Sequence, residues 1–302
     1  MTLDREFAAD LRAACPGLRV LEQEPLAQHT SFRIGGPAAC MAFPKDLSAL
    51  STLLTFCRAR NITTRLLGAG TNVLAPDDGL DALVICTKDA LTGLALHGST
   101  ITAMAGQTLA QTAVFARDHG LAGLEFAHGI PGTVGGGVFM NAGAYGGELS
   151  QVCARVTVML PDGTLRDYTP PEAAFGYRTS VFQQMPCIIV RAEFALAPDD
   201  PAAIRARMQE LLQKRRASQP LEYPSAGSAF KRPQGGYAAA LIDQAGLRGH
   251  RVGNAAVAEK HAGFIINLGG ATAQDVRALL SEVQSAVEKA SGIRLAPELR
   301  IW

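Results

Sequence analysis

Two glycine-rich segments carry the clearest chemical signal in the sequence. The first is Gly68-Ala69-Gly70-Thr71-Asn72, and the second, residues 129–137, reads GIPGTVGGG. Because glycine has no Cβ, its backbone N–H groups can approach a phosphate closely, and successive N–H groups can form an anion-binding nest. The two loops together predict binding of a diphosphate. For either loop alone, tight turns without a ligand are the favoured alternative.

Neither segment fits the common nucleotide-binding motifs. No glycine precedes a lysine anywhere in the chain, which excludes a Walker A loop. After Gly70 the sequence continues Thr71-Asn72-Val73, so the third glycine of a Rossmann fingerprint is missing. Pro76 also argues against a helix directly after this loop.

Length and charge limit the classes of protein to consider. The chain has 302 residues, of which 48% are hydrophobic and 18% charged, so two or three compact units are expected rather than a disordered chain. The 28 basic and 27 acidic residues nearly cancel. We therefore expect neither nucleic acid nor a membrane surface as the main partner.

The cysteines and the N-terminus predict a cytoplasmic protein. The six cysteines are scattered without a C-x-x-C pair or zinc-like spacing, which predicts reduced core thiols and no metal site. Leu3, Phe7 and Leu11 recur at helical spacing behind a possible cap at Thr2, rather than as a signal peptide. The uncharged run 126–147 carries eight glycines and Pro131, which would break a membrane-spanning helix.

The loops lie among mixed strands and helices. Strands are predicted over 38–43, 63–67, 80–87, 101–105, 187–197 and 264–267, with a hairpin over 152–168 that turns at 161–163. Helices are predicted from Asp46 to about residue 57, and over 109–119, 201–216, 237–245 and 272–289. Because strands and helices do not alternate strictly, the pattern favours an α+β fold.

A longer pattern around the second loop is far more specific. Residues 123–136, GLEFAHGIPGTVGG, followed by residues 141–148, NAGAYGGE, resemble the flavin-binding signature of the UDP-N-acetylenolpyruvoylglucosamine reductases. In the same order as in that family, the sequence also has TSFRIGG at 30–36, the loop 68–72, FGYRTS at 175–180, PSAGSAFK at 224–231 and APELR at 296–300. The resemblance covers nearly the whole chain from about residue 25, and the compact spacing resembles the shorter, type II group.

The resemblance implies an architecture. It predicts an α+β FAD-binding domain of the vanillyl-alcohol-oxidase type made of two α+β subdomains, plus a C-terminal α+β substrate-binding domain. The expected division is FAD-binding subdomain 1 over 1–75, to which residues 296–302 return, subdomain 2 over 76–200, and the substrate-binding domain over 201–295.

The family also implies the reaction and its residues. The enzyme would use NADPH and noncovalent FAD to reduce enolpyruvyl-UDP-N-acetylglucosamine to UDP-N-acetylmuramate, for peptidoglycan synthesis. Hydride addition at C3 leaves negative charge at C2 that spreads into the carboxylate, so a cation and a hydrogen-bonding acid should face that carboxylate. By resemblance these are Arg178 and Glu298, and Ser228 is the proton donor to C2.

Binding residues follow from the same resemblance. The implied FAD contacts are Gly68, Ala69, Gly70, Thr71, Asn72, Ile130, Pro131, Gly132, Thr133, Gly135, Gly136, Asn141, Gly143 and Arg300. The implied substrate contacts are Tyr145, Tyr177, Arg215, Lys231, Arg232, Arg248 and His261. Arg232 and Arg248 depart from the asparagine and lysine that are usual in the family. For His128 a structural or hydrogen-bonding role is favoured over a bond to flavin.

Two other functions compete with this one. The first is another FAD oxidoreductase on the same fold, such as an oxidase that passes electrons to oxygen. The second is a non-catalytic protein that binds flavin or a nucleotide. The joint presence of Arg178, Ser228 and Glu298 argues against both. No macromolecular partner is expected, and we expect a monomer.

Overall fold

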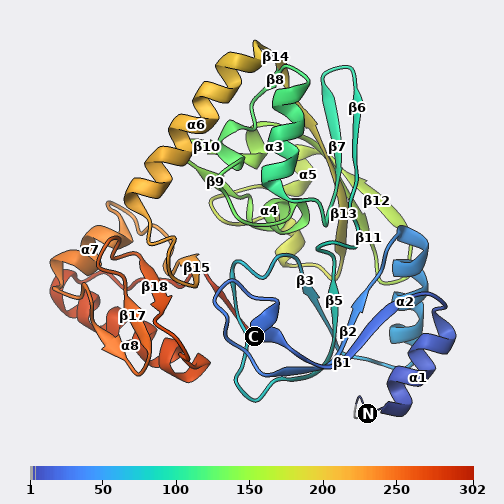
Figure 1. Ribbon diagram of the computed structural model, residues 1–302, viewed down its shortest axis with the longest axis horizontal. Coiled ribbons are helices and arrows are strands. Elements are labelled where there is room, and N and C mark those ends of the chain that lie inside the picture. The colour runs from blue at the N-terminus through green and yellow to red at the C-terminus, as the bar shows by residue number, and fades with distance from the viewer. Residues whose placement is uncertain (1–2, 4) are drawn as a thin grey trace. The chain divides into compact units, whose positions relative to one another are not determined.

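The computed structural model describes residue 3 and residues 5–302, which form two compact units. The first unit comprises Met1–Gln23, Ala39–Ala69 and Asp81–Lys214, and the second comprises Glu24–Ala38, Gly70–Leu80 and Arg215–Trp302. Each unit is therefore assembled from three separate segments of the chain. Figure 1 labels the helices and strands of both.

The first unit contains a small four-stranded sheet. In sheet order its strands are β1 (Arg19–Pro25), β2 (Pro37–Phe43), β5 (Leu80–Cys86) and β3 (Thr64–Leu67), and β3 runs parallel to β5. Helices α1 (Arg5–Ala14) and α2 (Leu47–Ala59) pack together beside it (Figure 1). The rings of Phe7 and Phe56 join the two helices at 5.8 Å, and both are buried in one core with Leu83. Glycine loop 68–72 begins where β3 ends.

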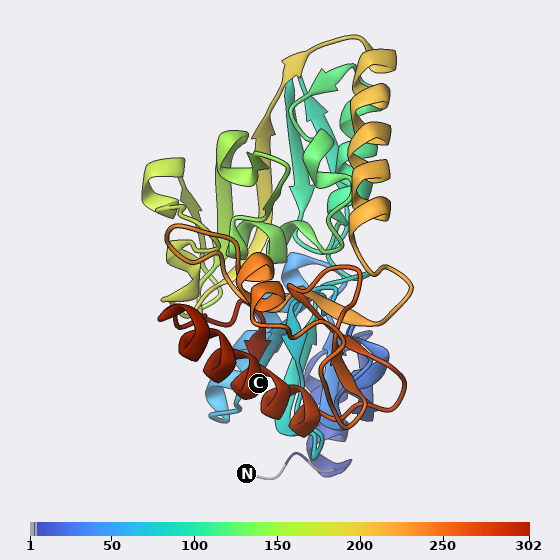
Figure 2. The same ribbon diagram turned by 90° about the vertical axis from the view of Figure 1, so that its left-hand side faces the viewer.

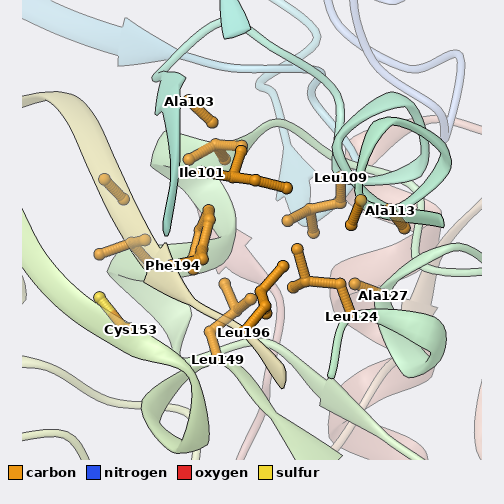
Figure 3. Close-up of a cluster of buried hydrophobic side chains, with 14 of the residues drawn as sticks. Ile101, Ala103, Leu109, Ala113, Leu124, Ala127, Leu149, Cys153, Phe194 and Leu196 are labelled. Atoms are coloured by element: carbon orange, nitrogen blue, oxygen red, sulfur yellow. The ribbon is translucent and has the colours of Figure 1, made fainter. Parts of the chain in front are cut away.

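A five-stranded antiparallel sheet forms the rest of the first unit. In sheet order its strands are β12 (Leu165–Tyr168), β11 (Cys153–Met159), β13 (Ile188–Ala195), β7 (Thr100–Met104) and β6 (Leu94–His97). The associated helices are α3 (Leu109–Asp118), α4 (Val134–Met140), α5 (Pro170–Ala173) and α6 (Pro201–Ser218). Side chains such as Ile101, Leu109 and Phe194 meet in the core (Figure 3).

Helix α6 runs along this unit as the long gold helix of Figure 2. Its Ile204 and Met208 join the core of the five-stranded sheet. On the helix surface the Arg207 guanidinium donates to the Glu125 and Asp199 carboxylates at 2.7 and 2.6 Å. Short elements complete the unit: β8 (Leu121–Ala122) with β14 (Ala197–Pro198), β9 (Gly143–Ala144) with β10 (Gly147–Glu148), and 3₁₀ turns Glu125–Ala127, Leu149–Gln151 and Val181–Gln183.

The second unit is built around an antiparallel sheet and one long helix. Its strands, in sheet order, are β15 (Ser225–Ser228), β18 (Phe264–Asn267), β17 (Ala255–Val257) and β16 (Arg251–Val252), and its helices are α7 (Ala238–Gln244) and α8 (Ala273–Ser291). Phe32, Ile34 and Leu74 are buried with the α8 side chains. Strand β4 (Val73–Leu74) pairs in parallel with β19 (Arg300–Ile301), and the 3₁₀ turn Leu26–Gln28 also belongs here.

The N-terminus of α8 is held by residues from two segments. Thr272 and Asp275 form the capping box that the sequence predicted. The Asp77 carboxylate, from a remote segment, accepts the N–H groups of Ala273 and Gln274 at 2.7 and 3.1 Å. The first N–H groups of a helix have no partner within the helix, so Asp77 both caps α8 and ties residues 70–80 to the C-terminal segment.

The structure confirms the α+β fold and the predicted elements, with ends shifted by a few residues. The possible cap at Thr2 lies outside the described residues. The elements that were not predicted include strands β1, β6, β15, β16 and β17 and helices α4 and α5. All six cysteines are free, and burial raises the pKa of Cys57 and Cys153 to about 12, as expected of unreactive core thiols. Among the described helices, none is long and apolar enough to cross a membrane.

Replacing Asp77 by alanine should destabilise the second unit. Two N–H groups of α8 lose their acceptor, and loss of a capping side chain costs about 0.5–2 kcal/mol. Urea unfolding followed by circular dichroism measures this change. Asp78→Ala is the matched control, because Asp78 is exposed beside Asp77. Equal stability of the two variants would show that the contact of Asp77 with α8 contributes nothing.

Candidate active site

The start of the first glycine-rich loop, Gly68 and Ala69, lies against the second loop in the first unit. A Cβ placed on Gly68 would lie 2.5 Å from the hydroxyl oxygen of Thr133 in the second loop. A Cβ placed on Gly135 would lie 3.0 Å from the Cβ of Ala105. Only glycine allows so close an approach at Gly68. The loops that were recognised separately in the sequence therefore form one cradle, made by Gly68, Ala69, Gly132 and Thr133.

The cradle presents backbone N–H groups to a ligand. Among the described residues, the N–H groups of Ala69, Gly132 and Thr133 donate to no protein acceptor. Thr133 is nevertheless buried, and a buried N–H group needs a partner. A group with several anionic oxygens would supply these partners, so the residues present fit the diphosphate of FAD.

Helix α4 forms in the glycine run where no helix was predicted. Thr133 begins it, with its hydroxyl accepting the Gly136 N–H at 3.4 Å. Val134 and Val138 are fully buried, and a Cβ on Gly137 would lie 2.9 Å from the Leu149 side chain. Packing against distant residues thus outweighs the low helix propensity of three consecutive glycines, and the local sequence does not reveal it.

Asn141 ends α4 and connects it to two other loops. Its φ of 43° is left-handed, a conformation in which asparagine is tolerated at a helix C-terminus. Its fully buried side chain donates to the Gly176 carbonyl at 3.0 Å and accepts the Ser150 N–H at 2.9 Å. Asn141 therefore fixes the loop that carries Arg178.

Arg178 occupies a strained position. Its φ of 56° is left-handed, which costs a residue with a Cβ about 1–2 kcal/mol. The guanidinium donates to the Gly143 carbonyl at 2.8 Å and to the Asn141 carbonyl at 3.5 Å, and it lies 5.1 Å from the centre of the Tyr177 ring. The surrounding structure therefore specifies both the backbone and the side chain of this candidate cation. Such local strain is frequent at functional sites.

Two polar residues near Arg178 were missed by sequence reasoning. The Ser180 hydroxyl and the Gln183 amide both donate to the Phe139 carbonyl, each at 2.8 Å. The Gln183 amide also donates to the Arg178 carbonyl at 3.1 Å. Ser180 is the last residue of the motif 175–180, where no role was predicted for it, and Gln183 lies three residues beyond the motif.

Glu298 lies in the second unit, where its backbone is fixed from both sides. The Glu298 N–H donates to the Ala229 carbonyl at 2.8 Å, and its carbonyl accepts the Asn72 side-chain amide at 3.2 Å. The Arg300 N–H donates back to the Asn72 carbonyl at 2.8 Å. The last residue of the first glycine loop thus holds the segment with the candidate acid.

Backbone pairing between residues 229–230 and residues 297–298 brings Ser228 close in the chain to Glu298. The N–H of Glu298 binds the residue directly after Ser228, and Phe230 pairs with Pro297. Ser228 itself is exposed, and its hydroxyl has no hydrogen-bond partner within the described chain. An irregularity in the β15–β18 pairing lies between Ser225 and Ser228. The hydroxyl is therefore free to meet a ligand.

The predicted substrate residues fall into both units. Tyr145 and Tyr177 lie in the first unit and are about half exposed, and Tyr145 is left-handed with a φ of 54°. In the second unit the Lys231 N–H donates to the Ala296 carbonyl at 2.8 Å, and Arg232 stacks at 4.2 Å on the Tyr237 ring. Arg215 lies in the last turn of α6.

Arg248 and His261 have defined protein partners. The Arg248 guanidinium donates to both carboxylate oxygens of Asp243, at 2.5 and 2.9 Å, and to the Glu259 carbonyl. This pairing lowers the pKa of Asp243. Burial, with a smaller effect of the Arg248 charge, lowers the pKa of His261, whose Nδ1 accepts the Gly263 N–H at 3.2 Å. His261 is therefore neutral at neutral pH.

His128 lies within the flavin-binding signature. Its Nδ1 is buried and has no hydrogen-bond partner among the described residues. Burial, and to a lesser extent the charge of Arg117, lowers the pKa of the imidazole, so the ring is neutral at neutral pH. The hydrogen-bonding role predicted for His128 therefore has no partner at Nδ1 among the described residues.

Comparison with known proteins gives concordant results. Residues 219–302 match the UDP-N-acetylenolpyruvoylglucosamine reductase C-terminal domain, and residues 38–169 match an FAD binding domain. The chain is 46% identical over 287 residues to UDP-N-acetylenolpyruvoylglucosamine reductase 2 of Symbiobacterium thermophilum, covering 95% of this chain and 93% of that protein. It is 43% identical over 293 residues to the reductase of Levilactobacillus brevis, with coverages of 97% and 96%.

A solved structure agrees with these relatives. The crystal structure of UDP-N-acetylenolpyruvylglucosamine reductase from Thermus caldophilus superposes with a TM-score of 0.80 at 35% identity, covering 94% of this chain and 98% of that one. The resemblance inferred from the sequence motifs is therefore confirmed, as is the FAD-binding domain.

Alanine at Gly68 should impair FAD binding. Its Cβ would press against the Thr133 hydroxyl at 2.5 Å and force the two loops apart. We expect FAD affinity to fall by about 5- to 150-fold, since overpacking typically costs about 1–3 kcal/mol. Flavin fluorescence titration of deflavinated protein measures it. Gly236→Ala is the control, because a Cβ there meets nothing within 4 Å. Unchanged affinity in Gly68→Ala would contradict the cradle.

Proposed function

Because the chain belongs to the UDP-N-acetylenolpyruvoylglucosamine reductase family, we propose that it reduces enolpyruvyl-UDP-N-acetylglucosamine to UDP-N-acetylmuramate with NADPH. The reaction supplies a precursor of peptidoglycan. The observation that carries the proposal is a relationship over 95% of the chain, which includes both the FAD-binding and the C-terminal domains. The fit of the cradle to a diphosphate supports it independently.

The cradle of Gly68, Ala69, Gly132 and Thr133 would hold FAD, which would supply the hydride-transfer chemistry between NADPH and the substrate. The side chains of the protein stabilise charge and donate the proton. Addition of hydride to C3 places negative charge at C2 and on the adjoining carboxylate. In our proposal the Arg178 guanidinium stabilises that carboxylate by charge, and Glu298, as a protonated carboxyl, donates a hydrogen bond to it. The fixed guanidinium of Arg178 and the fixed backbone of Glu298 support these roles, because a preorganised group needs little rearrangement during the reaction.

Ser228 delivers the proton to C2 in this mechanism. Its exposed hydroxyl without a protein partner supports this role, since a proton donor must be free to reach its acceptor. The proposed FAD contacts are the sequence-predicted loop residues, and the proposed substrate contacts include Lys231 and Arg215 as phosphate ligands. Arg248 can join them only by exchanging Asp243 for the phosphate.

Three further expectations accompany this function. We propose that the enzyme works in the cytoplasm as a monomer of the compact, type II form. We also propose that the family's three-part division, with boundaries near residues 75 and 200, applies to this chain. The parallel pairing of Arg300–Ile301 with Val73–Leu74 supports the return of the C-terminus to the N-terminal segment.

The visible spectrum of the purified protein tests the function. We expect a yellow protein with one FAD that acid releases, bleaching by NADPH, and rapid return of colour on addition of enolpyruvyl-UDP-N-acetylglucosamine. Rapid return of colour in air alone would indicate an oxidase. A bound flavin that NADPH cannot reduce would indicate a non-catalytic flavoprotein. Better reconstitution with FMN would contradict the FAD assignment.

Ser228→Ala should block only the second half-reaction. General acid catalysis typically contributes about 10²–10⁴-fold, so reduced flavin should reoxidise with the enolpyruvyl substrate more slowly by that order. FAD binding and reduction by NADPH should remain close to the parent values. Stopped-flow absorbance separates the two steps.

The matched control is Ser225→Ala in the same strand. Arg178→Ala should differ from Ser228→Ala, because losing the cation weakens substrate binding as well as reoxidation. If Ser228→Ala reoxidised at the parent rate, or already failed at reduction by NADPH, Ser228 would not be the proton donor.

A further inference from the structure

Arg178 is the second central residue of a tight four-residue turn. Gly176 and Thr179 exchange backbone hydrogen bonds at 3.1 and 3.2 Å, with Tyr177 and Arg178 between them. The φ of 56° at Arg178 is a conformation that glycine normally supplies in turns. An arginine keeps such a backbone only where its surroundings determine it.

Gln183 contributes a contact that acts on this backbone directly. Its side-chain Nε2 donates to the Arg178 carbonyl at 3.1 Å and to the Phe139 carbonyl at 2.8 Å. Phe139 lies in the last turn of α4, where carbonyl groups lack helical partners. One amide group therefore joins the strained residue to the end of the helix that begins at the cradle.

The two ends of Arg178 are thus held separately. Its guanidinium is bound by the Gly143 carbonyl and its own carbonyl by Gln183. Asn141 holds the first residue of the turn, Gly176, and Gln183 holds the third. Without Gln183 the turn keeps its reciprocal hydrogen bonds but loses the contact that fixes the peptide after Arg178.

We propose that Gln183 is a positioning residue that sets the direction of the Arg178 guanidinium. The proposal rests on the proposed role of Arg178 as the cation facing the substrate carboxylate. Gln183 does not itself contact the reacting atoms. A purely structural glutamine would contribute to stability alone, whereas a positioning residue changes the step that depends on Arg178.

Gln183→Leu keeps most of the side-chain volume and removes the amide contacts with the Phe139 and Arg178 carbonyls and with the Met140 sulfur. We expect flavin reduction by NADPH to remain near the parent rate, and reoxidation by enolpyruvyl-UDP-N-acetylglucosamine to slow about 10- to 100-fold, because a small misplacement of a catalytic group costs that order. Gln184→Leu is the matched control, since Gln184 is the exposed neighbour. Parent-rate reoxidation in Gln183→Leu would overturn the proposal.

A double-mutant cycle shows whether Gln183 acts through Arg178. In the Arg178→Ala background, Gln183→Leu should cause no further slowing. The same fold-loss in both backgrounds would mean that Gln183 acts independently of Arg178, and the proposal would be wrong. If Arg178→Ala alone reoxidised at the parent rate, the proposed role of Arg178 would fail, and this single variant would reveal that failure.

Gln183→Glu provides a second test should the leucine variant fold poorly. An ionised carboxylate cannot donate to the two carbonyls, whereas a protonated carboxyl has one O–H donor. An unperturbed glutamate titrates near about pH 4.3, and its pKa should be raised among carbonyl oxygens. The ratio of variant to parent reoxidation rates should therefore rise as the pH falls from about 8 to about 5. A ratio that stays at one, or a deficit independent of pH, would count against positioning by this donor.

Discussion

At residue 298 three segments of the chain that are remote in sequence exchange hydrogen bonds. The Glu298 N–H binds Ala229, and its carbonyl binds the side chain of Asn72, which is 226 residues away. Each bond contributes only about 0.5–1.5 kcal/mol net to stability. These bonds matter because of the geometry that they fix. They join Asn72 at the end of a glycine loop, the candidate acid Glu298, and the residue after Ser228. The backbone of Glu298 is therefore fixed only when all three segments of the second unit have folded together.

In the first unit, Asn141 likewise joins segments that are remote in sequence. Here a buried amide ties the end of α4 to the loop with Arg178 and to Ser150. Arg178 can then hold a left-handed backbone that an isolated peptide would avoid. In both units a residue with proposed chemistry sits on irregular backbone, and regular elements support it from a distance. This arrangement places functional groups at the ends of rigid helices and strands while leaving them accessible.

Local patterns in the sequence predicted the regular elements well, because hydrophobic spacing and capping residues act over one or two turns. Asp46, Thr272 and Asp275 marked helix starts that the structure shows. Helix α4 escaped prediction because its stability comes from packing of Val138 and Gly137 against residues outside the run. Strand β15 was not predicted because it has only four residues and its pairing with β18 is irregular.

For the candidate site, the motifs led to the correct loops but not to their partners. The glycine pattern indicated a diphosphate, yet nothing local showed that Gly68 would lie against Thr133. Likewise the resemblance implies that Arg248 contacts the substrate, but its pairing with Asp243 depends on a turn between α7 and β16. Contacts between segments far apart in sequence produce no local pattern of residues. They therefore cannot be predicted from a single sequence.

Carboxamide side chains recur among the contacts that hold these loops. Asn72, Asn141 and Gln183 each donate to a backbone carbonyl, and Asn267 does so at Phe32 in the second unit. Irregular backbone leaves N–H and C=O groups without partners, and burying such a group unpaired costs more than one hydrogen bond returns. An amide offers donor and acceptor on one short planar group and carries no charge. A carboxylate of the same shape would lose the donor and bring a charge into the interior. The need to satisfy loop carbonyls therefore explains why amides, rather than acids, lie behind both Arg178 and Glu298.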